Sequence, residues 1–383
     1  MSPSDPDRPP SIRMRLPRSL KAHRAAGLTL ALAAILPAVA SAQRNDLTLT
    51  EKWRARGVPG VMAFGAVEGI VETDAREIWV SDPIGRAVLG LDSLGRRGRI
   101  VAREGDGPGE VRSPTLSARI PSGGVAIYDQ GHDAVELFGR DGRFVRRVTL
   151  SAKVLNPKGL AVLPNGQILL SGGLASGGGG AVHRFAANGR LLGSWGAVAQ
   201  ARNERAVGLI SGGPLALLRE GSVLYSQAAP HMLAIYSPIG KRQQRLAADR
   251  TVVAPIGDAF IQVRGNRRVF QWRFPQSAGV FRLPDNDNDD NNDNVLNVVW
   301  NAQANTSTWE VYHGDTGALV VRKRFARAYR PWAITNNGHV MATVVDATTG
   351  EATVVRLEVR VTEANRPVAR PQMRAAARVG RAP

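Results

Sequence analysis

Short apolar runs of strand length alternate with turn residues along most of the chain, and the turns form two series that are out of phase. Runs bounded by Gly, Asn, Asp and Pro are typical of β-strands, and none shows a sustained helical period. A repeat of this kind predicts a repeated architecture. The first series lies at Asp74-Ala75, 122–124, Asn165-Gly166, Glu220-Gly221, 285–294 and Asn337-Gly338, and the second at Gly95, Gly142, Gly189, Gly240 and Gly317.

Each first-series turn joins two predicted strands, and each second-series glycine separates a third strand from a fourth. The third strands carry apolar residues at an odd spacing, such as Val88 and Leu91, which places them on opposite faces. Both faces of each sheet are therefore apolar and must pack against other parts of the protein. Predicted first strands are 69–73, 116–120, 159–163, 214–218, 279–283 and 332–335; second strands are 77–80, 125–128, 167–170, 222–225, 295–300 and 339–344; fourth strands are 99–102, 144–150, 191–195, 242–246 and 319–325.

The sixth repeat supplies only three predicted strands and ends near Val361. The pattern also predicts a strand at Asp46–Trp53, which has no partner of its own. Pairing the two would close a ring and leave no free sheet edge. Six four-stranded antiparallel sheets of roughly 45 residues each around one axis make a six-bladed β-propeller, the all-β fold that we predict. Amphipathic helices between strands, which βαβ units need, are missing. Two stacked sandwiches would make the phase of the repeat a coincidence.

The chain ends differ from this pattern. Basic residues between Arg13 and Arg24 precede an apolar run, 27–39, and then Ala40-Ser41-Ala42, the sequence of a secretory signal peptide cleaved before Gln43. The last 20 residues hold five arginines and no acid. We therefore predict a signal peptide at 1–42, a propeller at 43–363 and a disordered basic tail at 364–383. Export would place the protein in the periplasm or outside the cell, with no membrane span.

The amino-acid composition indicates how the protein is stabilised and which class of partner it could bind. The chain has no cysteine, so an exported form relies on its core rather than on disulfides. Its net charge is +18, and removing the six basic and two acidic residues of 1–42 leaves +14. One interpretation is that GC-rich coding inflates Arg and Ala. The other is a positive surface and tail that bind an anionic polymer.

Several motifs resemble those of known propellers. Ser81-Asp82-x-x-Gly85-Arg86-Ala87-Val88-x-x-Leu91 and Tyr128-Asp129-Gln130-Gly131-His132 resemble NHL-type repeats. Gly105-Asp106-Gly107-Pro108-Gly109-Glu110 is similar to an element of a family of exported bacterial six-bladed propellers, most of which have no assigned function. The resemblance covers roughly 46–360 and is clearest over 69–200. It weakens between 250 and 310, where Thr251–Gln276 is an insertion or a poorly repeating blade edge.

Candidate site residues lie in loops that share one mouth of the predicted channel. Converging Asp and His side chains can bind a metal ion or act as acid and base. The alternative is that such Asp side chains cap turns by accepting bonds from nearby backbone amides. The candidates for ligand binding are Asp82, Arg86, Asp129, His132, Asp133 and His231.

Two further segments are candidate ligand-binding sites. The 105–110 loop could cradle an anion through its backbone amides, or form the tight bend that leads from one blade to the next. The alternating acids of 285–294 resemble a calcium loop, with candidate ligands Asp285, Asp287, Asp289 and Asp293. However, Asp290 stands where a calcium loop has glycine, and Leu296 where it has Glu. A solvated turn is the competing interpretation, and we predict no other cofactor.

Catalytic motifs are missing: the sequence contains no Gly-x-Ser-x-Gly elbow, no His-Glu-x-x-His and no Cys. A non-catalytic binding propeller that recognises a protein, glycan or other envelope ligand at the loop-lined mouth is therefore the favoured function. A metal-dependent hydrolase, lactonase or lyase is one alternative, because propeller lactonases and lyases resemble this fold. A binder of anionic polymers is another. We expect a monomer.

Overall fold

The structure is a computed structural model that describes residues 45–199, 204–218, 221–227, 231–246, 260–264, 267–271, 276–284, 294–301, 304–346 and 349–362. All of them belong to one compact unit, Gln43–Pro383. The predicted signal peptide, the basic tail 364–383 and the four candidate calcium ligands at 285–293 lie outside the described residues.

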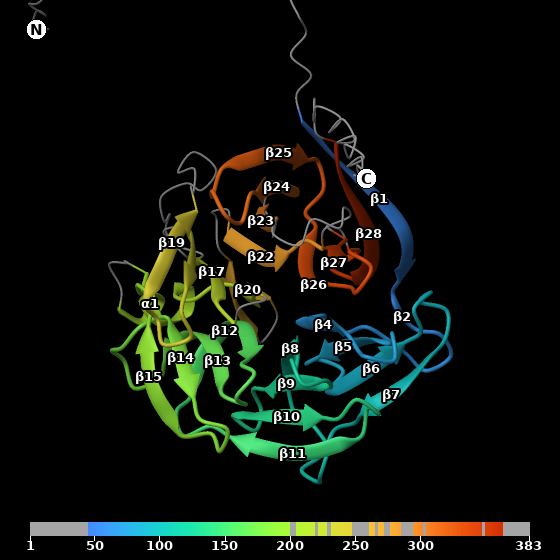
Figure 1. The fold of residues 1–383 in the computed structure, drawn as a ribbon. Helices are drawn as coiled ribbons and strands as arrows, with labels where there is room; N and C mark the ends of the chain where they lie inside the picture. The colour runs from blue at the N-terminus through green and yellow to red at the C-terminus, as the bar shows by residue number, and fades with distance from the viewer. Residues whose placement is uncertain are drawn as a thin grey trace, which may run out of the picture. The chain divides into compact units, whose positions relative to one another are not determined.

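Six four-stranded antiparallel sheets, which we call blades 1 to 6, build this unit (Figure 1). Blade 1 holds β4 (Gly69–Glu72), β5 (Ile78–Asp82), β6 (Ala87–Leu91) and β7 (Gly98–Ala102). Blade 2 holds β8 (Pro114–Arg119), β9 (Val125–Asp129), β10 (Ala134–Phe138) and β11 (Phe144–Thr149). Blade 3 holds β12 (Val154–Val162), β13 (Ile168–Leu174), β14 (Val182–Phe185) and β15 (Leu191–Trp195).

The remaining blades follow the same order. Blade 4 holds β16 (Leu215–Leu217), β17 (Val223–Gln227), β18 (Met232–Tyr236) and β19 (Arg242–Leu246). Blade 5 holds β22 (Gln276–Arg282), β23 (Val295–Asn301), β24 (Thr306–Tyr312) and β25 (Leu319–Phe325). Blade 6 holds β26 (Arg330–Ile334), β27 (Val340–Val345), β28 (Ala352–Thr362) and β1 (Asp46–Ala55).

The first strand of each blade lies nearest the centre in Figure 1, and the fourth lies at the rim. Inner strands contact one another in chain order, from β4 through β8, β12, β16 and β22 to β26, and β26 contacts β4 again. The predicted six-bladed β-propeller is confirmed.

The fourth strand of blade 6 comes from the other end of the chain. β1 pairs antiparallel with β28, from Asp46 opposite Thr362 to Ala55 opposite Val354. The register shifts between Glu51 and Trp53, which marks a β-bulge. Leu47 of β1 is fully buried in the cluster that joins blades 5 and 6.

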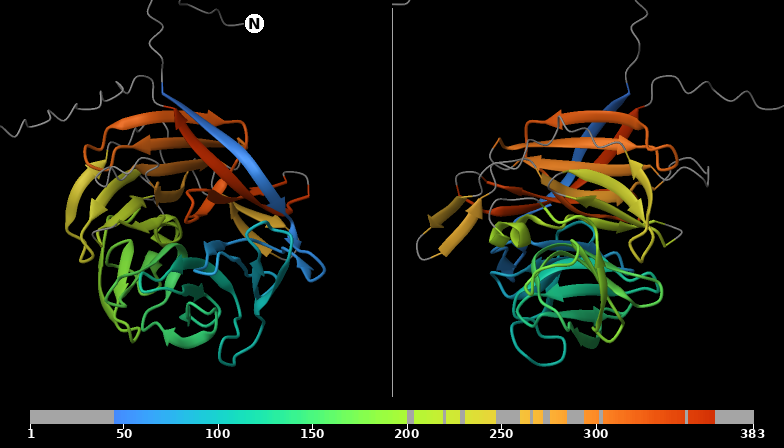
Figure 2. Two further views of the ribbon diagram at one scale, coloured as in Figure 1. Left: turned by 45° about the vertical axis from the view of Figure 1, so that its right-hand side comes forward. Right: turned by 90° about the vertical axis from the view of Figure 1, so that its left-hand side faces the viewer.

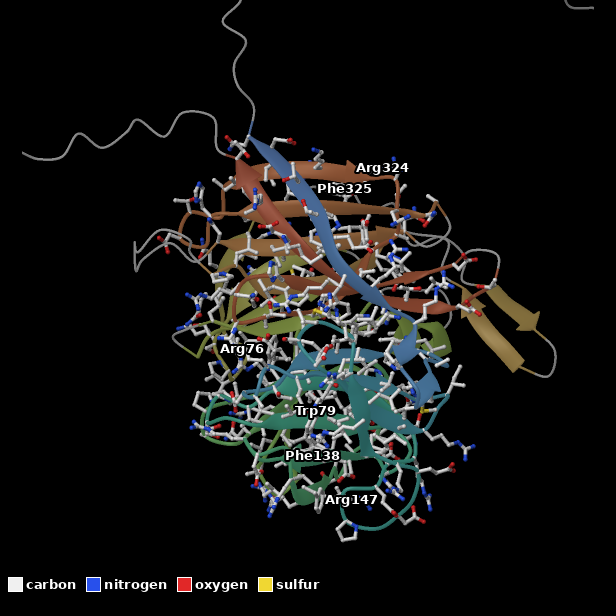
Figure 3. The ribbon with its side chains drawn as sticks, turned by 90° about the vertical axis from the view of Figure 1, so that its right-hand side faces the viewer. Arg76, Trp79, Phe138, Arg147, Arg324 and Phe325 are labelled. Carbon is white, nitrogen blue, oxygen red and sulfur yellow. The ribbon has the colours of Figure 1, made fainter. Side chains whose placement is uncertain are left out.

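The core is divided among the blade interfaces, as the odd spacing in the third strands predicts. Val88 packs with Trp79 and Phe138 between blades 1 and 2, whereas Leu91 packs between blades 1 and 6. Trp79 and Phe138 meet edge to face, with ring centroids 5.3 Å apart (Figure 3). The other third strands divide in the same way at Val135 and Phe138, Val182 and Phe185, Leu233 and Tyr236, and Trp309 and Tyr312.

Buried hydroxyls add a polar link between neighbouring blades. The Ser81 and Ser117 hydroxyls lie 2.9 Å apart, joining β5 to β8. Ser171 of β13 donates to the Gly213 carbonyl at 2.5 Å. Ser226 of β17 donates to Ser277 of β22 at 2.7 Å. Because a buried hydroxyl without a partner costs about 1–3 kcal/mol, these bonds also fix how adjacent blades align.

Three segments depart from the four-strand repeat. A short helix, α1 (Glu204–Ile210), precedes blade 4, although the sequence pattern predicts no helix. A hairpin of β20 (Phe260–Arg264) and β21 (Arg267–Gln271) precedes blade 5, inside the predicted insertion, and a small hairpin of β2 (Gly57–Val58) and β3 (Met62–Ala63) precedes blade 1. α1 and β20–β21 lie on the same side of the propeller (Figure 2).

We call this side the loop face. It carries the connections between blades and those between second and third strands. The opposite side, the turn face, carries the hairpin turns of the first series. Of the helices among the described residues, none has the length and hydropathy of a membrane span.

Candidate functional site

Asp82 and Asp129 end the second strands of blades 1 and 2 on the loop face, and both side chains are fully buried. Asp82 accepts bonds from the amides of Gly65 and Ala66, in the connection that enters blade 1, and from two amides of its own turn. Asp129 accepts from Arg112, Ser113 and Gly131 in the same way. Both carboxylates therefore cap turns and fasten the incoming connection.

His132 lies between carboxylates of blade 2. Its Nε2 is 2.9 Å from Asp106 Oδ1, and its Nδ1 is 2.6 Å from Asp129 Oδ2 and 3.8 Å from Glu136 Oε1. One ligand-type atom each of Asp129, His132 and Glu136 lies within 4.8 Å of the others. Among the described residues, no other three Asp, Glu or His side chains converge so closely.

Glu136 occupies the middle of β10 and is fully buried. Arg147, opposite it on β11, donates from Nε to Glu136 Oε1 at 2.5 Å. Burial raises the pKa of Glu136, and the Asp129 carboxylate acts in the same direction while Arg147 opposes both. Arg147 lies on the outer strand of blade 2 (Figure 3), so the cluster sits away from the propeller axis.

The 105–110 loop covers this cluster, and a side chain of the loop itself occupies its concave side. The Glu110 carboxylate accepts the Gly107 amide at 2.9 Å, and a Cβ at Gly105 would come within 1.9 Å of the same carboxylate. Arg147 donates to the carbonyls of Asp106 and Glu110. Since the protein's own carboxylate occupies the concave side, this loop is the bend between blades and offers no cradle for an anion.

The other predicted residues do not join the cluster. Exposed Arg86 pairs with Glu104. Asp133 pairs with Lys153 at 2.9 Å. The Nδ1 of His231 contacts the Gln227 carbonyl at 3.3 Å. Burial lowers the pKa of His231, and the Glu310 carboxylate opposes this.

Blade 5 contains a counterpart of the Glu136–Arg147 pair. Glu310 lies in the middle of β24 and accepts from Arg322 of β25 at 2.8 Å. Its second oxygen accepts from Asn297 Nδ2 at 2.9 Å and from Tyr312 Oη at 3.0 Å. This carboxylate is therefore satisfied at both oxygens, and it forms a buried polar network rather than a reactive site.

Near the axis, Arg330 begins the inner strand of blade 6 on the loop face. Its guanidinium lies 4.0 Å from the ring centroid of Trp332 and 5.5 Å from that of Trp300, and it donates to Glu68 at 3.0 Å. Trp332 packs against the cluster of blades 1 and 6 and also against that of blades 2 and 3. Its indole therefore reaches across the hub.

Lys158 of β12 fastens α1 to blade 3. Its Nζ donates to the carbonyls of Leu209 and Ser211 at 3.2 and 2.8 Å, and Asn156 donates to Leu209 as well. Burial of the ammonium group lowers the pKa of Lys158 to about 7. The cation caps the carboxyl end of the helix, where positive charge is favourable.

A surface recess of about 500 Å³ lies beside the β2–β3 hairpin. It is lined by residues 54–63 and Gly95 and includes none of the predicted site residues.

Sequence reasoning missed Asp106, Glu136 and Arg147 as parts of one cluster. The signal for Glu136 is a single acid inside an apolar strand, Ala-Val-Glu-Leu-Phe at 134–138, which must find a partner when both sheet faces are covered. The same signal marks Glu310 within Trp-Glu-Val-Tyr at 309–312. Which partner each acid finds depends on contacts that are remote in the sequence.

No protein-family model matches this chain, and no curated protein matches its sequence. Its fold is similar to that of a member of the DUF4221 family from Bacteroides vulgatus, with a TM-score of 0.54, 6% identity, and coverage of 84% of this chain and 100% of that one. A virginiamycin B lyase from Staphylococcus aureus has a TM-score of 0.46 and 9% identity over 82% of this chain and 99% of that chain.

A gluconolactonase from Xanthomonas campestris has a TM-score of 0.47 and 15% identity over 76% of this chain and 86% of that chain. The DUF4221 protein shows the shared propeller fold and nothing about activity. The similarity to the two enzymes is too low to carry any argument about function.

Proposed function

We propose that the protein is an exported, non-catalytic binding propeller whose loop face recognises a protein or glycan of the cell envelope. The main support is how Asp82 and Asp129 are used. Both are buried, and each of their oxygens accepts at least one backbone amide. A carboxylate held in this way stabilises a turn and is not placed to take a proton from a substrate.

The binding surface that we propose surrounds Arg330 at the centre of the loop face. Arg330 is about one-third exposed, and it stacks on Trp332 near Trp300. Arginine and tryptophan are enriched among the residues that contribute most to binding energy, because both combine a flat contact area with polar donors. Glu68 holds the guanidinium in place and adds an acceptor for a ligand hydroxyl or amide.

The test uses purified peptidoglycan sacculi and an array of envelope glycans as ligands, with surface-exposed envelope proteins in a parallel panel. The variant Arg330→Ala should bind at least about tenfold more weakly than the unmodified chain. Arg76→Ala is the control, because Arg76 lies in a turn of the turn face and is exposed. Equal loss in both variants, or none in Arg330→Ala, would contradict the proposed surface.

The competing enzymatic function predicts turnover. A metal-dependent hydrolase or lyase would use Asp129, His132 or His231 as a base or a ligand. However, Asp129 is fully buried and the His132 side chain is only 10% exposed, which leaves little room for a substrate. Hydrolysis of a lactone, or elimination from a cyclic ester, that disappears in Asp129→Asn and His231→Gln would overturn the non-catalytic proposal.

A further inference from the structure

The cluster on blade 2 contains an arrangement that turn capping does not explain. We propose that Asp129, His132 and Glu136 form a site for a divalent cation of the Zn²⁺ class, and that the bound ion stabilises blade 2 together with the 105–110 loop. The proposal concerns a structural ion and is independent of the ligand proposed for the loop face.

His132 supplies the first argument. Its Nε2 faces Asp106 Oδ1 at 2.9 Å, and because a carboxylate oxygen only accepts, the proton of the neutral ring belongs on Nε2. Nδ1 then carries a lone pair, yet it lies 2.6 Å from Asp129 Oδ2, another acceptor. Two lone pairs this close need a positive charge between them. The contact lacks hydrogen-bond geometry, so a proton on Nδ1 would not point at that oxygen.

Glu136 supplies the second, independent argument. Its Oε1 accepts from Arg147 and is the oxygen that lies 3.8 Å from His132 Nδ1, while its buried Oε2 has no hydrogen-bond partner among the described residues. A buried carboxylate with one unsatisfied oxygen is costly, and a cation bound by this carboxylate would offset part of that cost.

Comparison with blade 5 shows why Oε2 lacks a partner. Asn297 and Tyr312 donate to the second oxygen of Glu310. In blade 2, Ile127 lies opposite Glu136 where Asn297 lies opposite Glu310, and Phe138 stands two residues after Glu136 where Tyr312 follows Glu310. Blade 2 therefore keeps the arginine partner and replaces both neutral donors by apolar side chains. The Glu136 carboxylate therefore keeps a binding capacity that Glu310 has already used.

The ligand types indicate the ion. One imidazole nitrogen and two carboxylate oxygens suit Zn²⁺, Mn²⁺ or Fe²⁺ better than Ca²⁺, which prefers oxygen alone. Asp106 would act as the outer partner that fixes the histidine tautomer, a common arrangement around metal-bound histidine. Because Asp129 and Glu136 are fully buried, the ion would be enclosed and structural.

The experiment uses the full chain, stripped with EDTA and then supplied with ZnCl₂, MnCl₂ or CaCl₂. We expect one Zn²⁺ per chain by elemental analysis and a rise in melting temperature of several degrees with Zn²⁺. His132→Gln and Glu136→Gln should each weaken Zn²⁺ binding by at least tenfold. Glu310→Gln is the matched control: it lowers stability but keeps the response to Zn²⁺.

Two results would overturn the proposal. One is a melting temperature and metal content that do not respond to Zn²⁺ or Mn²⁺, as expected if a proton on His132 holds the cluster together. The other is Zn²⁺ binding that survives in both variants, which would place the ion elsewhere. If a variant does not fold, anomalous scattering at the zinc edge from crystals of the unmodified chain decides: a peak beside His132 supports the site, and no peak there excludes it.

Discussion

The role of an aspartate that resembles a catalytic residue in this sequence depends on the groups that surround it. Asp82 and Asp129 hold the connections that enter blades 1 and 2, whereas Gly172 and Gln227 occupy the same place in blades 3 and 4. Helix α1 and hairpin β20–β21 lie in the connections into blades 4 and 5. The aspartate therefore accompanies the connections of intermediate length, Ala55 to Gly69 and Ala102 to Pro114, and is missing beside the much shorter connection into blade 3, Thr149 to Val154.

Replacing Asp82 by Ala tests this role. Four backbone amides would lose their acceptor inside the protein, and we expect a loss of about 2–4 kcal/mol in the free energy of unfolding. Asp92→Ala should cost only about 1 kcal/mol, because Asp92 caps a more exposed turn. Urea denaturation measures both. Equal costs would show that Asp82 does no more than cap its own turn.

Lys158 predicts a rise of stability with pH. Its pKa is about 7 in the folded protein against 10.5 ordinarily, so between these values the unfolded chain binds more protons than the folded one. The free energy of unfolding should therefore increase from pH 7 to pH 9 and be lowest below pH 7. Thermal unfolding at these pH values measures the slope.

Lys158→Met should flatten that slope, because it removes the titrating amine. Three other buried groups titrate outside the range from pH 7 to pH 9: burial lowers the pKa of His183 and His231 below the ordinary value of 6.5, and burial raises the pKa of Tyr225 above 10. A slope that persists in Lys158→Met would assign the pH dependence to another group.

At the scale of elements, glycines in the turns are not equivalent. Gly189 has a φ of +86°, and a Cβ there would lie 1.9 Å from the Thr149 carbonyl oxygen. Gly221 has a φ of +76° with open space around it. Gly221→Ala should cost about 1–2 kcal/mol of backbone strain, and Gly189→Ala about 3 kcal/mol or more, because strand β11 must also move. Calorimetric unfolding that gives equal costs would contradict the close approach.

The strands could be predicted from the sequence because each is short, apolar on both faces and bounded by turns. Predicted boundaries such as 69–73 and 242–246 fall within a residue or so of β4 and β19. The inner strands of blades 2, 3 and 5 begin earlier than predicted, at Pro114, Val154 and Gln276, since their first residues are less regular in polarity.

Other elements could not be predicted in this way. α1 has seven residues, too few for a helical period to stand out, and close packing of Gly173 against Gly208 holds it in place. The β20–β21 hairpin carries a sequence signal, Gly-Asn between two strand-like runs, but it interrupts the phase of the repeat. The Glu136 cluster depends on a loop from the preceding connection, and no local pattern encodes that contact.

At the scale of the whole molecule, some of the positive charge is neutralised by nearby carboxylates and some is free to bind an anion. Many arginines of the described residues contact carboxylates, including Arg99 with Glu77 and Arg119 with Asp74. The five arginines of 364–383 have no acid near them in the sequence. Binding to a polyanion would therefore depend mainly on that segment.

A chain that ends at Glu363 tests this dependence. With double-stranded DNA as a model polyanion, it should bind at least about tenfold more weakly than the full chain at low salt. The slope of log affinity against log salt should also become smaller in magnitude by about 4.5, which corresponds to five arginines. Titration by fluorescence anisotropy measures both. Unchanged binding would place the polyanion site on the blades and favour the polymer-binding function.

The pairing of β1 with β28 has a consequence for biosynthesis. The two strands are separated by about 300 residues of chain, so β1 is synthesised long before its partner. Until translation reaches Thr362, β1 has only non-native partners available. A prematurely terminated product keeps an unpaired sheet edge in blade 6. Until β28 has been made, the incomplete chain therefore exposes an edge at which other chains can add.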